Sequence, residues 1–368
     1  MPSAHAQFEG LAQVLKAWVA TSEARDARHD QAMDLIVDAL AAELSGTGTY
    51  GSRADWQRPA ELLALEGSTH PLILFAVAYS SDVEGDGRKA SREYSEALQA
   101  LSKASVPESF RLVAATRAAV HEDSWGTVDA AKPYHIMQRD SFLALLAADV
   151  PPDRVERMAE IGMALIEAMQ PDIARDLALR LEDMENVDPW LREAIIGAYE
   201  MRAAWDERGG GYASTVSHEQ LSRFASRLER AYVRLHRAWQ LNPSRPQAAT
   251  RLVTVTMGGG APTEETCRMW FDRALAAQPD FEPAFQAMLW AMRPRWGGSF
   301  ASMYEVGTAA LEGGRFETQA PMMYAKALLD LTEEGVGLEL LASPEVRARL
   351  DALADGYTKA GNTSNRSR

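Results

Sequence analysis

The chain has 368 residues, of which 46% are hydrophobic and 24% are charged, and its formal net charge is -14. A composition this close to that of ordinary globular proteins excludes wholesale disorder and fibrous architectures. The negative charge also argues against nucleic acid as the main partner, because phosphate backbones would be repelled at long range.

The longest uncharged apolar run, from Pro71 to Tyr79, is far shorter than the roughly 20 residues that span a bilayer. The N-terminus lacks the basic head and apolar core of a secretion signal, so we expect a cytoplasmic protein that makes no use of a membrane. The single cysteine, Cys267, excludes an intrachain disulfide and a zinc site of several thiolates, and it is expected to be a small packing residue. No cofactor is expected.

Helical patterns dominate the first half of the chain, because apolar residues recur every three or four positions without strand-like alternation. Residues 7–44 predict two amphipathic helices or one bent helix, ended by the glycine-rich stretch 45–52. The segment from Glu122 to Tyr134 is expected to be a loop. Residues 1–185 are thus predicted to form helical hairpins, with the remaining helices at about 53–65, 69–81, 88–104, 107–120, 136–148, 152–169 and 171–184.

The second half, residues 186–357, carries clearer helix starts. Asp188 and Pro189 predict the start of a helix, since Asp caps free amides and Pro presets the first helical φ. Ser217 and Gln220 predict a capping box. Residues 358–368 are expected to be a flexible tail. Helices are expected at about 188–207, 217–241, 245–257, 263–277, 282–292, 299–312, 318–332 and 344–357.

One sequence unit recurs in this half. Arg237 and Ala238 with a following Pro243 reappear as Arg273 and Ala274 with Pro279, an offset of 36 residues. At that offset small residues align with small or aromatic ones, and large residues with large ones; the pairs are Ala231 with Cys267, Leu235 with Phe271, Ala248 with Ala284, Ala249 with Phe285 and Leu252 with Met288. Small residues let two antiparallel helices approach closely, so the repeat predicts stacked helix pairs.

The series Cys267, Phe271, Ala274 and Pro279 resembles the second helix of the tetratricopeptide repeat, and Phe285 resembles the large aromatic residue of the next first helix. The resemblance covers about residues 217–332 and implies an all-α superhelix of paired helices. The helix before this unit departs from the family, because it lacks the Leu-Gly-x-x-Tyr series and has Val253 to Gly258 instead, followed by Gly259 and Gly260.

Three longer runs, 204–212, 238–243 and 294–299, resemble an uncharacterised family of bacterial tetratricopeptide-like proteins. This resemblance implies a bacterial source and makes the two glycine-rich loops family features. It implies no activity, because no function is assigned to that family.

Residues 82–93 fit the spacing of a calcium loop, with side-chain oxygens at Asp82, Glu84, Asp86 and Glu93 and glycine at the sixth position. Against this reading, the glutamate at the third position is long for the geometry, and Lys89 occupies a position that is usually apolar. The alternative is a solvated acidic turn between two helices.

Five arginines share one face of the helix predicted at 217–241 and flank its apolar seam; they are Arg223, Arg227, Arg230, Arg234 and Arg237. They predict either a groove for an anionic peptide or carboxylate, or side chains that cover apolar surface and pair with acidic residues of a neighbouring helix.

The loop from Arg208 to Thr215 is rich in glycine and precedes a helix, so it could cradle an anion on its backbone amides. The alternative is a connector that Trp205 and Tyr212 pack down. Arg295 and Trp296 precede a second glycine turn, which Ser299 is expected to close as a helix cap.

Catalytic motifs are absent from the linear sequence, and the seven histidines are scattered. His121 and His135 could join a metal site with Glu122 and Asp123, but the spacing does not place two of these on one helical face. The sequence therefore favours a protein-interaction scaffold that binds a peptide or protein partner. The alternative is a helical enzyme or anion sensor with its site at residues 208–216. The oligomeric state is left open.

Overall fold

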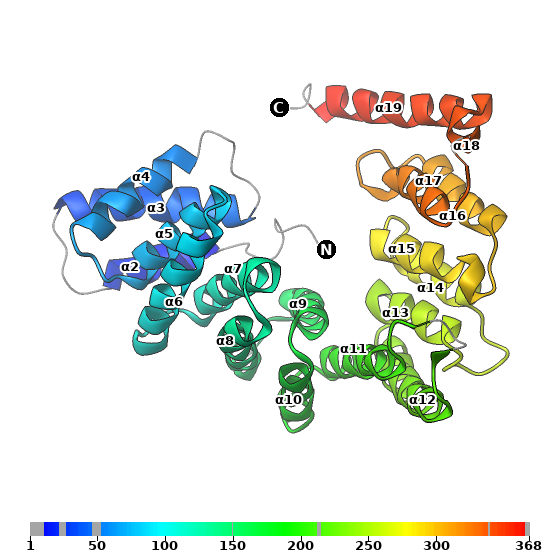
Figure 1. The fold of residues 1–368 in the computed structure, drawn as a ribbon, viewed down its shortest axis with the longest axis horizontal. Helices are drawn as coiled ribbons and strands as arrows, with labels where there is room; N and C mark the ends of the chain where they lie inside the picture. Colours follow the sequence, from blue (N-terminus) through cyan, green and yellow to red (C-terminus); the bar gives the residue numbers. More distant parts are fainter. Residues whose placement is uncertain are drawn as a thin grey trace. The chain divides into compact units, whose positions relative to one another are not determined.

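The structure is a computed structural model that describes residues 11–21, 27–45, 53–148, 150–211, 215–337 and 339–364. Within these ranges the chain forms α-helices and short 3₁₀ turns and no strand, which confirms the all-α class (Figure 1). The chain divides into two compact units, Met1–Asp188 and Pro189–Arg368, here called unit 1 and unit 2. No helix of the described ranges is long and apolar enough to cross a membrane.

Unit 1 is a series of consecutive helix pairs, of which α5 with α6 and α7 with α8 pack most closely. Its core is aromatic at the centre, where Trp56, Phe75 and Phe110 are fully buried. Its elements are α2 (Leu11–Thr21), α3 (Ala27–Ser45), α4 (Arg53–Leu65), α5 (Pro71–Val83), α6 (Gly87–Lys103), α7 (Glu108–Trp125), α8 (Val128–Ala147), η1 (Pro152–Arg154), α9 (Val155–Ala168) and α10 (Pro171–Glu182).

The loop expected over 122–134 is wrong. Helix α7 continues to Trp125, and α8 begins at Val128 after a tight turn through Gly126 and Thr127. Thr127 supplies the N-cap, since its hydroxyl oxygen accepts from the Ala130 N–H at 3.2 Å. Pro133 suggests a break, but it lies early in α8 and costs that helix a single hydrogen bond.

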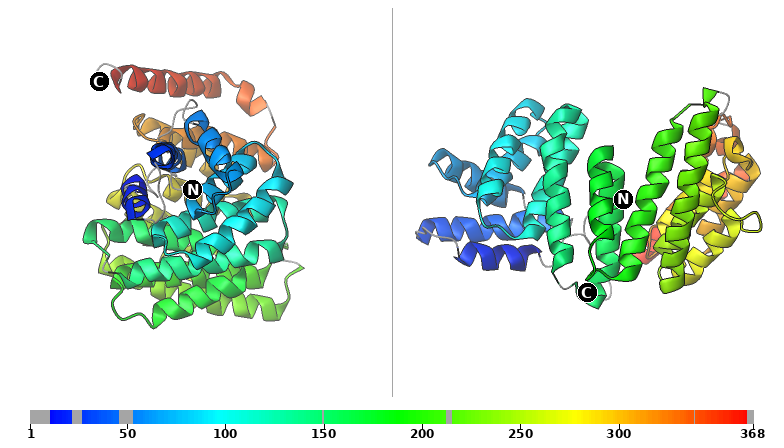
Figure 2. Two further views of the ribbon diagram at one scale, coloured as in Figure 1. Left: turned by 90° about the vertical axis from the view of Figure 1, so that its left-hand side faces the viewer. Right: turned by 90° about the horizontal axis from the view of Figure 1, so that it is seen from below.

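Unit 2 continues the paired arrangement, and Figure 2 shows its first two helices, α11 and α12, side by side. The predicted capping box is present at the start of α12, where Ser217 and Gln220 satisfy each other's backbone N–H groups. The elements are α11 (Pro189–Arg208), α12 (His218–Leu241), α13 (Pro246–Met257), α14 (Cys267–Ala277), α15 (Glu282–Ala291), η3 (Pro294–Trp296), α16 (Phe300–Glu312), η4 (Ala320–Met322), α17 (Met323–Glu333), α18 (Glu339–Ala342) and α19 (Pro344–Ser364).

The 36-residue offset holds in space as well as in sequence. Helix α12 ends at Leu241 and α14 ends at Ala277, and both alanines that precede these ends, Ala238 and Ala274, are fully buried. The aligned pairs on α13 and α15 are buried too, among them Leu252 with Met288. Small buried residues at matching positions therefore let the helices of both pairs approach closely.

Several predicted boundaries differ from the structure, among them one helix start and one helix end. Helix α14 begins at Cys267, not near 263, because Thr266 caps it by accepting from the Met269 N–H at 3.1 Å. Helix α19 continues to Ser364, past residue 358, where the sequence predicts the tail to begin. Polar residues can continue a surface helix, so composition alone places such an end poorly.

Candidate functional site

Helices α11 and α12 form the base of the candidate site and approach each other very closely. A Cβ atom on Gly197 of α11 would lie 2.6 Å from Leu235 Cγ of α12, so only glycine permits this contact. The apolar seam of α12 packs against α11 and α13. Its buried members are Phe224, Leu228, Ala231, Leu235 and Ala238. This packing fixes which side chains of the two helices meet at their shared edge.

The arginine row of α12 is matched by a row of glutamates on α11. Arg227 pairs with Glu200 and Glu207, each at 2.9 Å, and Arg230 also reaches Glu200, at 3.2 Å. Further along, Arg234 lies 3.2 Å from the buried carboxylate of Glu193.

The two ends of the row are more exposed. Arg237 lies 3.6 Å from Glu193, and Arg223 pairs with Glu219 of its own helix. The charges of these arginines are therefore met by carboxylates of the chain itself, the arrangement expected if they cover the helix pair. An incoming anion would have to displace those carboxylates.

A different set of predicted residues gathers where α11 ends. The Trp205 ring of α11 lies edge-to-face on Phe224 of α12, with ring centroids 4.8 Å apart, and on Trp296 of η3, at 5.3 Å. The guanidinium carbon of Arg208 lies 5.3 Å from the Trp296 ring and 5.8 Å from the Trp205 ring. We call these four residues the tryptophan–arginine cluster. It joins the two glycine-rich loops, which are far apart in the sequence.

The end of α13 packs against this cluster. Gly258 stands so close that a Cβ atom there would lie 2.5 Å from Leu228 Cδ1 and 3.5 Å from the Trp205 ring. The indole nitrogens of Trp205 and Trp296 are both buried and have no hydrogen-bond partner among the described residues. A buried indole N–H without an acceptor carries a desolvation cost.

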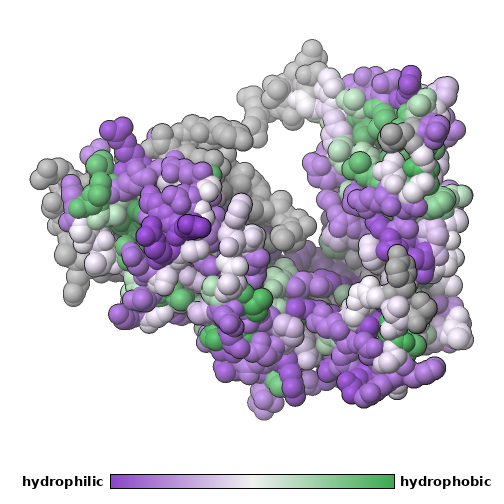
Figure 3. All heavy atoms as spheres, in the orientation of Figure 1, coloured by the Kyte–Doolittle hydropathy of each residue, from purple (hydrophilic) through white to green (hydrophobic). Residues whose placement is uncertain are grey.

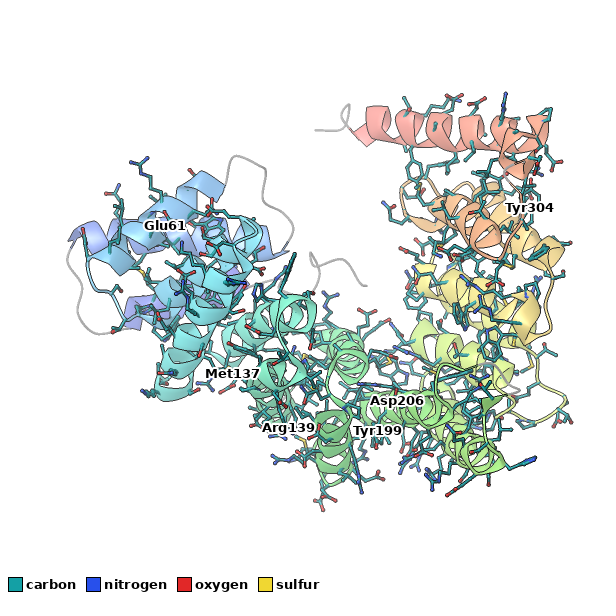
Figure 4. All side chains as sticks on the ribbon, in the orientation of Figure 1. Glu61, Met137, Arg139, Tyr199, Asp206 and Tyr304 are labelled. Carbon is teal, nitrogen blue, oxygen red and sulfur yellow. The ribbon has the colours of Figure 1, made fainter. Side chains whose placement is uncertain are left out.

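Arg208 differs from the arginine row because no carboxylate of the described residues pairs with it. Its Nη1 donates to the carbonyl oxygens of Gly209, at 3.1 Å, and Gly211, at 3.3 Å. Asp206, labelled in Figure 4 on α11, lies 3.4 Å from the Arg202 Nε instead. Tyr212 lies outside the described residues.

Arg295 does not join the cluster, although Trp296 follows it directly. Its guanidinium pairs with Glu334, the residue that follows α17, and lies 5.5 Å from the Trp290 ring. The structure thus brings Trp205, Arg208 and Trp296 together and separates them from Arg295. Phe224, the fourth member, belongs to the buried apolar seam of α12.

A second aromatic group was missed altogether. Arg273 of α14 lies between two indoles, with its guanidinium carbon 4.5 Å from the Trp239 ring and 4.3 Å from the Trp270 ring. The repeat could have pointed to this group, because Arg273 directly precedes Ala274, one of the two alanines that recur at the 36-residue offset. In Figure 3, hydrophilic and hydrophobic residues are interspersed over the visible face of unit 2.

The calcium-loop candidates of unit 1 do not converge on one point, because their carboxylates have separate partners. Asp82 lies in the last turn of α5, where Tyr94 and His121 occupy its two carboxylate oxygens. Asp86 caps α6 by accepting from the Lys89 N–H, and Glu84 is exposed. Across the described residues, no group of three or more His, Cys, Asp or Glu side chains is placed to hold a metal ion.

Glu93, the fourth calcium-loop candidate, is partly buried on α6. Burial raises its pKa above the usual value, and the Ser81 hydrogen bond and the Lys89 charge oppose this rise. A carboxyl whose folded-state pKa is raised destabilises the fold at neutral pH, and the penalty vanishes below its unfolded pKa of about 4.3.

We therefore expect Glu93→Gln to raise the melting temperature at pH 7, with the gain shrinking as the pH falls toward 4. Thermal unfolding followed by circular dichroism at both pH values measures this. Glu84→Gln, which changes an exposed carboxylate of the segment 82–93, serves as the control. A lower melting temperature for Glu93→Gln at pH 7 would mean that Ser81 and Lys89 stabilise the carboxylate more than burial penalises it.

No family model matches this chain. No curated protein matches it either. Among solved structures, the chain is similar to one described as the crystal structure of the APC/C hetero-tetramer Cut9-Hcn1, with 12% sequence identity and a TM-score of 0.26 over 96% of this chain and 81% of that chain.

Proposed function

We propose that this protein is an interaction scaffold and that unit 2 binds an acidic segment of a peptide or protein partner at the tryptophan–arginine cluster. The observation that carries the proposal is the state of Arg208, a cation held against two indole rings with no carboxylate partner among the described residues. A guanidinium in this state can form a paired hydrogen bond with an incoming carboxylate.

The surroundings of Arg208 suit a peptide better than an isolated carboxylate. Trp205 and Trp296 are half-buried, so each offers ring surface beside the cation. Tryptophan and arginine in partly desolvated clusters are typical of residues that dominate binding energy at protein interfaces. The arginine row of α12 contributes less in this proposal, because its charges are already met by Glu193, Glu200 and Glu207.

The test selects peptides from a random displayed library on the full-length protein and measures their affinity by fluorescence polarisation. We expect the selected peptides to be enriched in Asp and Glu and to bind Arg208→Ala at least about tenfold more weakly, a loss of about 1.4 kcal/mol. Trp296→Ala is expected to weaken the same peptides.

The matched control is Arg230→Ala, which removes an arginine of unit 2 that is half exposed but paired with Glu200. It is expected to leave peptide affinity unchanged. Peptides without acidic enrichment, or peptides that bind Arg208→Ala as tightly as the unchanged protein, would overturn the proposal.

A small anion is the second candidate, because the same unpaired guanidinium would also bind a phosphate or carboxylate metabolite. Thermal-shift measurements with inorganic phosphate, nucleotides and dicarboxylates separate the two candidates. Stabilisation by one of these compounds that Arg208→Ala removes, together with no selected peptide, would favour the anion sensor over the scaffold.

A further inference from the structure

Three helices of unit 1 bring a serine, a histidine and an aspartate into one chain of hydrogen bonds. His121 of α7 lies with its Nε2 3.1 Å from the Ser91 Oγ of α6 and its Nδ1 2.6 Å from the Asp82 Oδ1 of α5. A nucleophile within hydrogen-bond reach of a base, with the base oriented by a third group, is the arrangement that activates serine for acyl transfer. None of these residues belongs to the cluster of unit 2.

The partners of Asp82 fix the orientation of the imidazole. Tyr94 donates its hydroxyl to the Asp82 Oδ2 at 3.1 Å, and burial, with Asp82 beside it, raises the Tyr94 pKa and keeps that hydroxyl protonated. Because a carboxylate only accepts hydrogen bonds, the His121 Nδ1 carries a proton toward Asp82. In a neutral imidazole the Nε2 lone pair then faces Ser91 and can accept its proton.

The Gly87 carbonyl oxygen lies 3.2 Å from the same Nε2. Once the nitrogen has taken a proton from Ser91, this carbonyl accepts a hydrogen bond from the new N–H, while Asp82 offsets the charge of the imidazolium. These two partners thus stabilise the imidazolium that the proton transfer produces.

We propose that Ser91 is a nucleophile that accepts an acyl group from an activated, uncharged ester, with His121 as general base and Asp82 as the residue that orients it. In this step the Ser91 oxygen bonds to the ester carbonyl carbon and its proton passes to the His121 Nε2. The ester C–O bond breaks, and the leaving group departs as an anion with the bonding electrons. The products are an acylated serine, an imidazolium and an alkoxide or phenolate.

The burial of His121 decides which leaving groups fit. Its side chain has 0% exposure, so the protonated Nε2 cannot readily reach a departing group to protonate it. Amides, whose amine must be protonated to leave, are therefore poor substrates, whereas aryl esters and other groups that leave as stable anions are suitable. Water is also excluded from Nε2, so we expect the acyl group to stay on Ser91 and turnover to be slow.

An exposed tryptophan beside this site favours apolar acyl groups. Trp125 is 74% exposed at the end of α7, one turn after His121. Its side-chain carbons would lie 3.8 Å from a Cβ atom on Gly87, whose carbonyl faces His121. The indole therefore covers the edge of α6 that leads to Ser91, where it can pack against an aliphatic or aromatic group of the ester.

The experiment mixes the full-length protein with p-nitrophenyl butyrate and follows the release of p-nitrophenolate. We expect a rapid burst of about one equivalent followed by slow turnover, and butyrylation of Ser91 in peptide mass spectra. Ser91→Ala is expected to abolish the burst. Asp82→Asn is expected to slow acylation by about 10²-fold or more, since it removes the acceptor that orients His121.

The matched control is Ser102→Ala, another serine of α6, whose hydroxyl donates to the Leu98 carbonyl and contacts no base. It is expected to retain the full burst. Thermal unfolding of Ser91→Ala checks that the fold persists, because this variant removes a single hydroxyl. Absence of a burst, an acyl group found on lysines alone, or a burst that survives Ser91→Ala would overturn the proposal.

Discussion

Replacing Arg293 by methionine is expected to lower the free energy of unfolding by about 3 kcal/mol. Arg293 follows α15, and its side chain is only 7% exposed. Its guanidinium lies 3.2 Å from Asp330 of α17 and 2.9 Å from Glu334, the residue that follows α17. Methionine keeps much of the side-chain volume but leaves the Asp330 carboxylate, 4% exposed, with less positive charge near it.

We expect this loss of unfolding free energy to fall at the lower end of the range for breaking a buried ion pair. The reason is that Lys326 still pairs with Asp330, and Arg295 still pairs with Glu334. Stacking of Arg293 on Trp290, with its guanidinium carbon 4.4 Å from the ring, is lost as well. Urea unfolding followed by tryptophan fluorescence measures the change, and hydrogen exchange of α15 and α17 peptides locates it.

Arg315→Met is the matched control, because Arg315 also pairs with two carboxylates but its side chain is 43% exposed. Exposed ion pairs contribute about 0–1 kcal/mol, so this variant is expected to unfold almost as the unchanged protein does. Equal losses for the two variants would show that burial of the Arg293 network does not matter to its energy.

Replacing Trp270 by alanine is expected to cost about 3–5 kcal/mol, the range for removing a large buried aromatic side chain. Trp270 of α14 is fully buried in the core of unit 2, and its indole N–H donates to the Glu265 carboxylate at 2.9 Å. Its ring lies edge-to-face on Trp239, with centroids 5.4 Å apart, and beneath the Arg273 guanidinium. The variant removes all three contacts and leaves a cavity.

Trp270→Phe separates the packing from the hydrogen bond. It keeps an aromatic ring but loses the N–H donor to Glu265, so we expect a loss clearly smaller than that of the alanine variant. Both are compared by urea unfolding of the full-length protein. If phenylalanine and alanine destabilised the protein equally, the hydrogen bond rather than the buried ring would hold α14 in place.

The helix starts were predictable where a few adjacent residues decide them. The box formed by Ser217 and Gln220 depends on a three-residue spacing, and a proline at the first turn fits only a helix start, so α12 and α13 began close to where the sequence places them. The loop expected over 122–134 was wrong because a tight turn at Gly126 and Thr127 separates α7 from α8, and Pro133 is tolerated early in α8.

The repeat was predictable for a related reason. A buried alanine such as Ala238 or Ala274 marks a close helix contact, and a fixed offset between two of them repeats that contact along the chain. The positions of charged partners were not predictable in this way. The arginine row pairs with glutamates of α11 because of how the two helices are rotated against each other, and Gly197 permits that approach.

The sequence by itself determined that this chain is all-α, where most of its helices begin, and that one helix pair recurs with a 36-residue offset. These properties follow from periodicity and from caps, which act over a few neighbouring residues. Only the tertiary structure decided that Trp205 meets Trp296 and that Ser91 meets His121. Each of these contacts joins residues of different helices, and side-chain packing between helices, which no local pattern encodes, sets the distance between them.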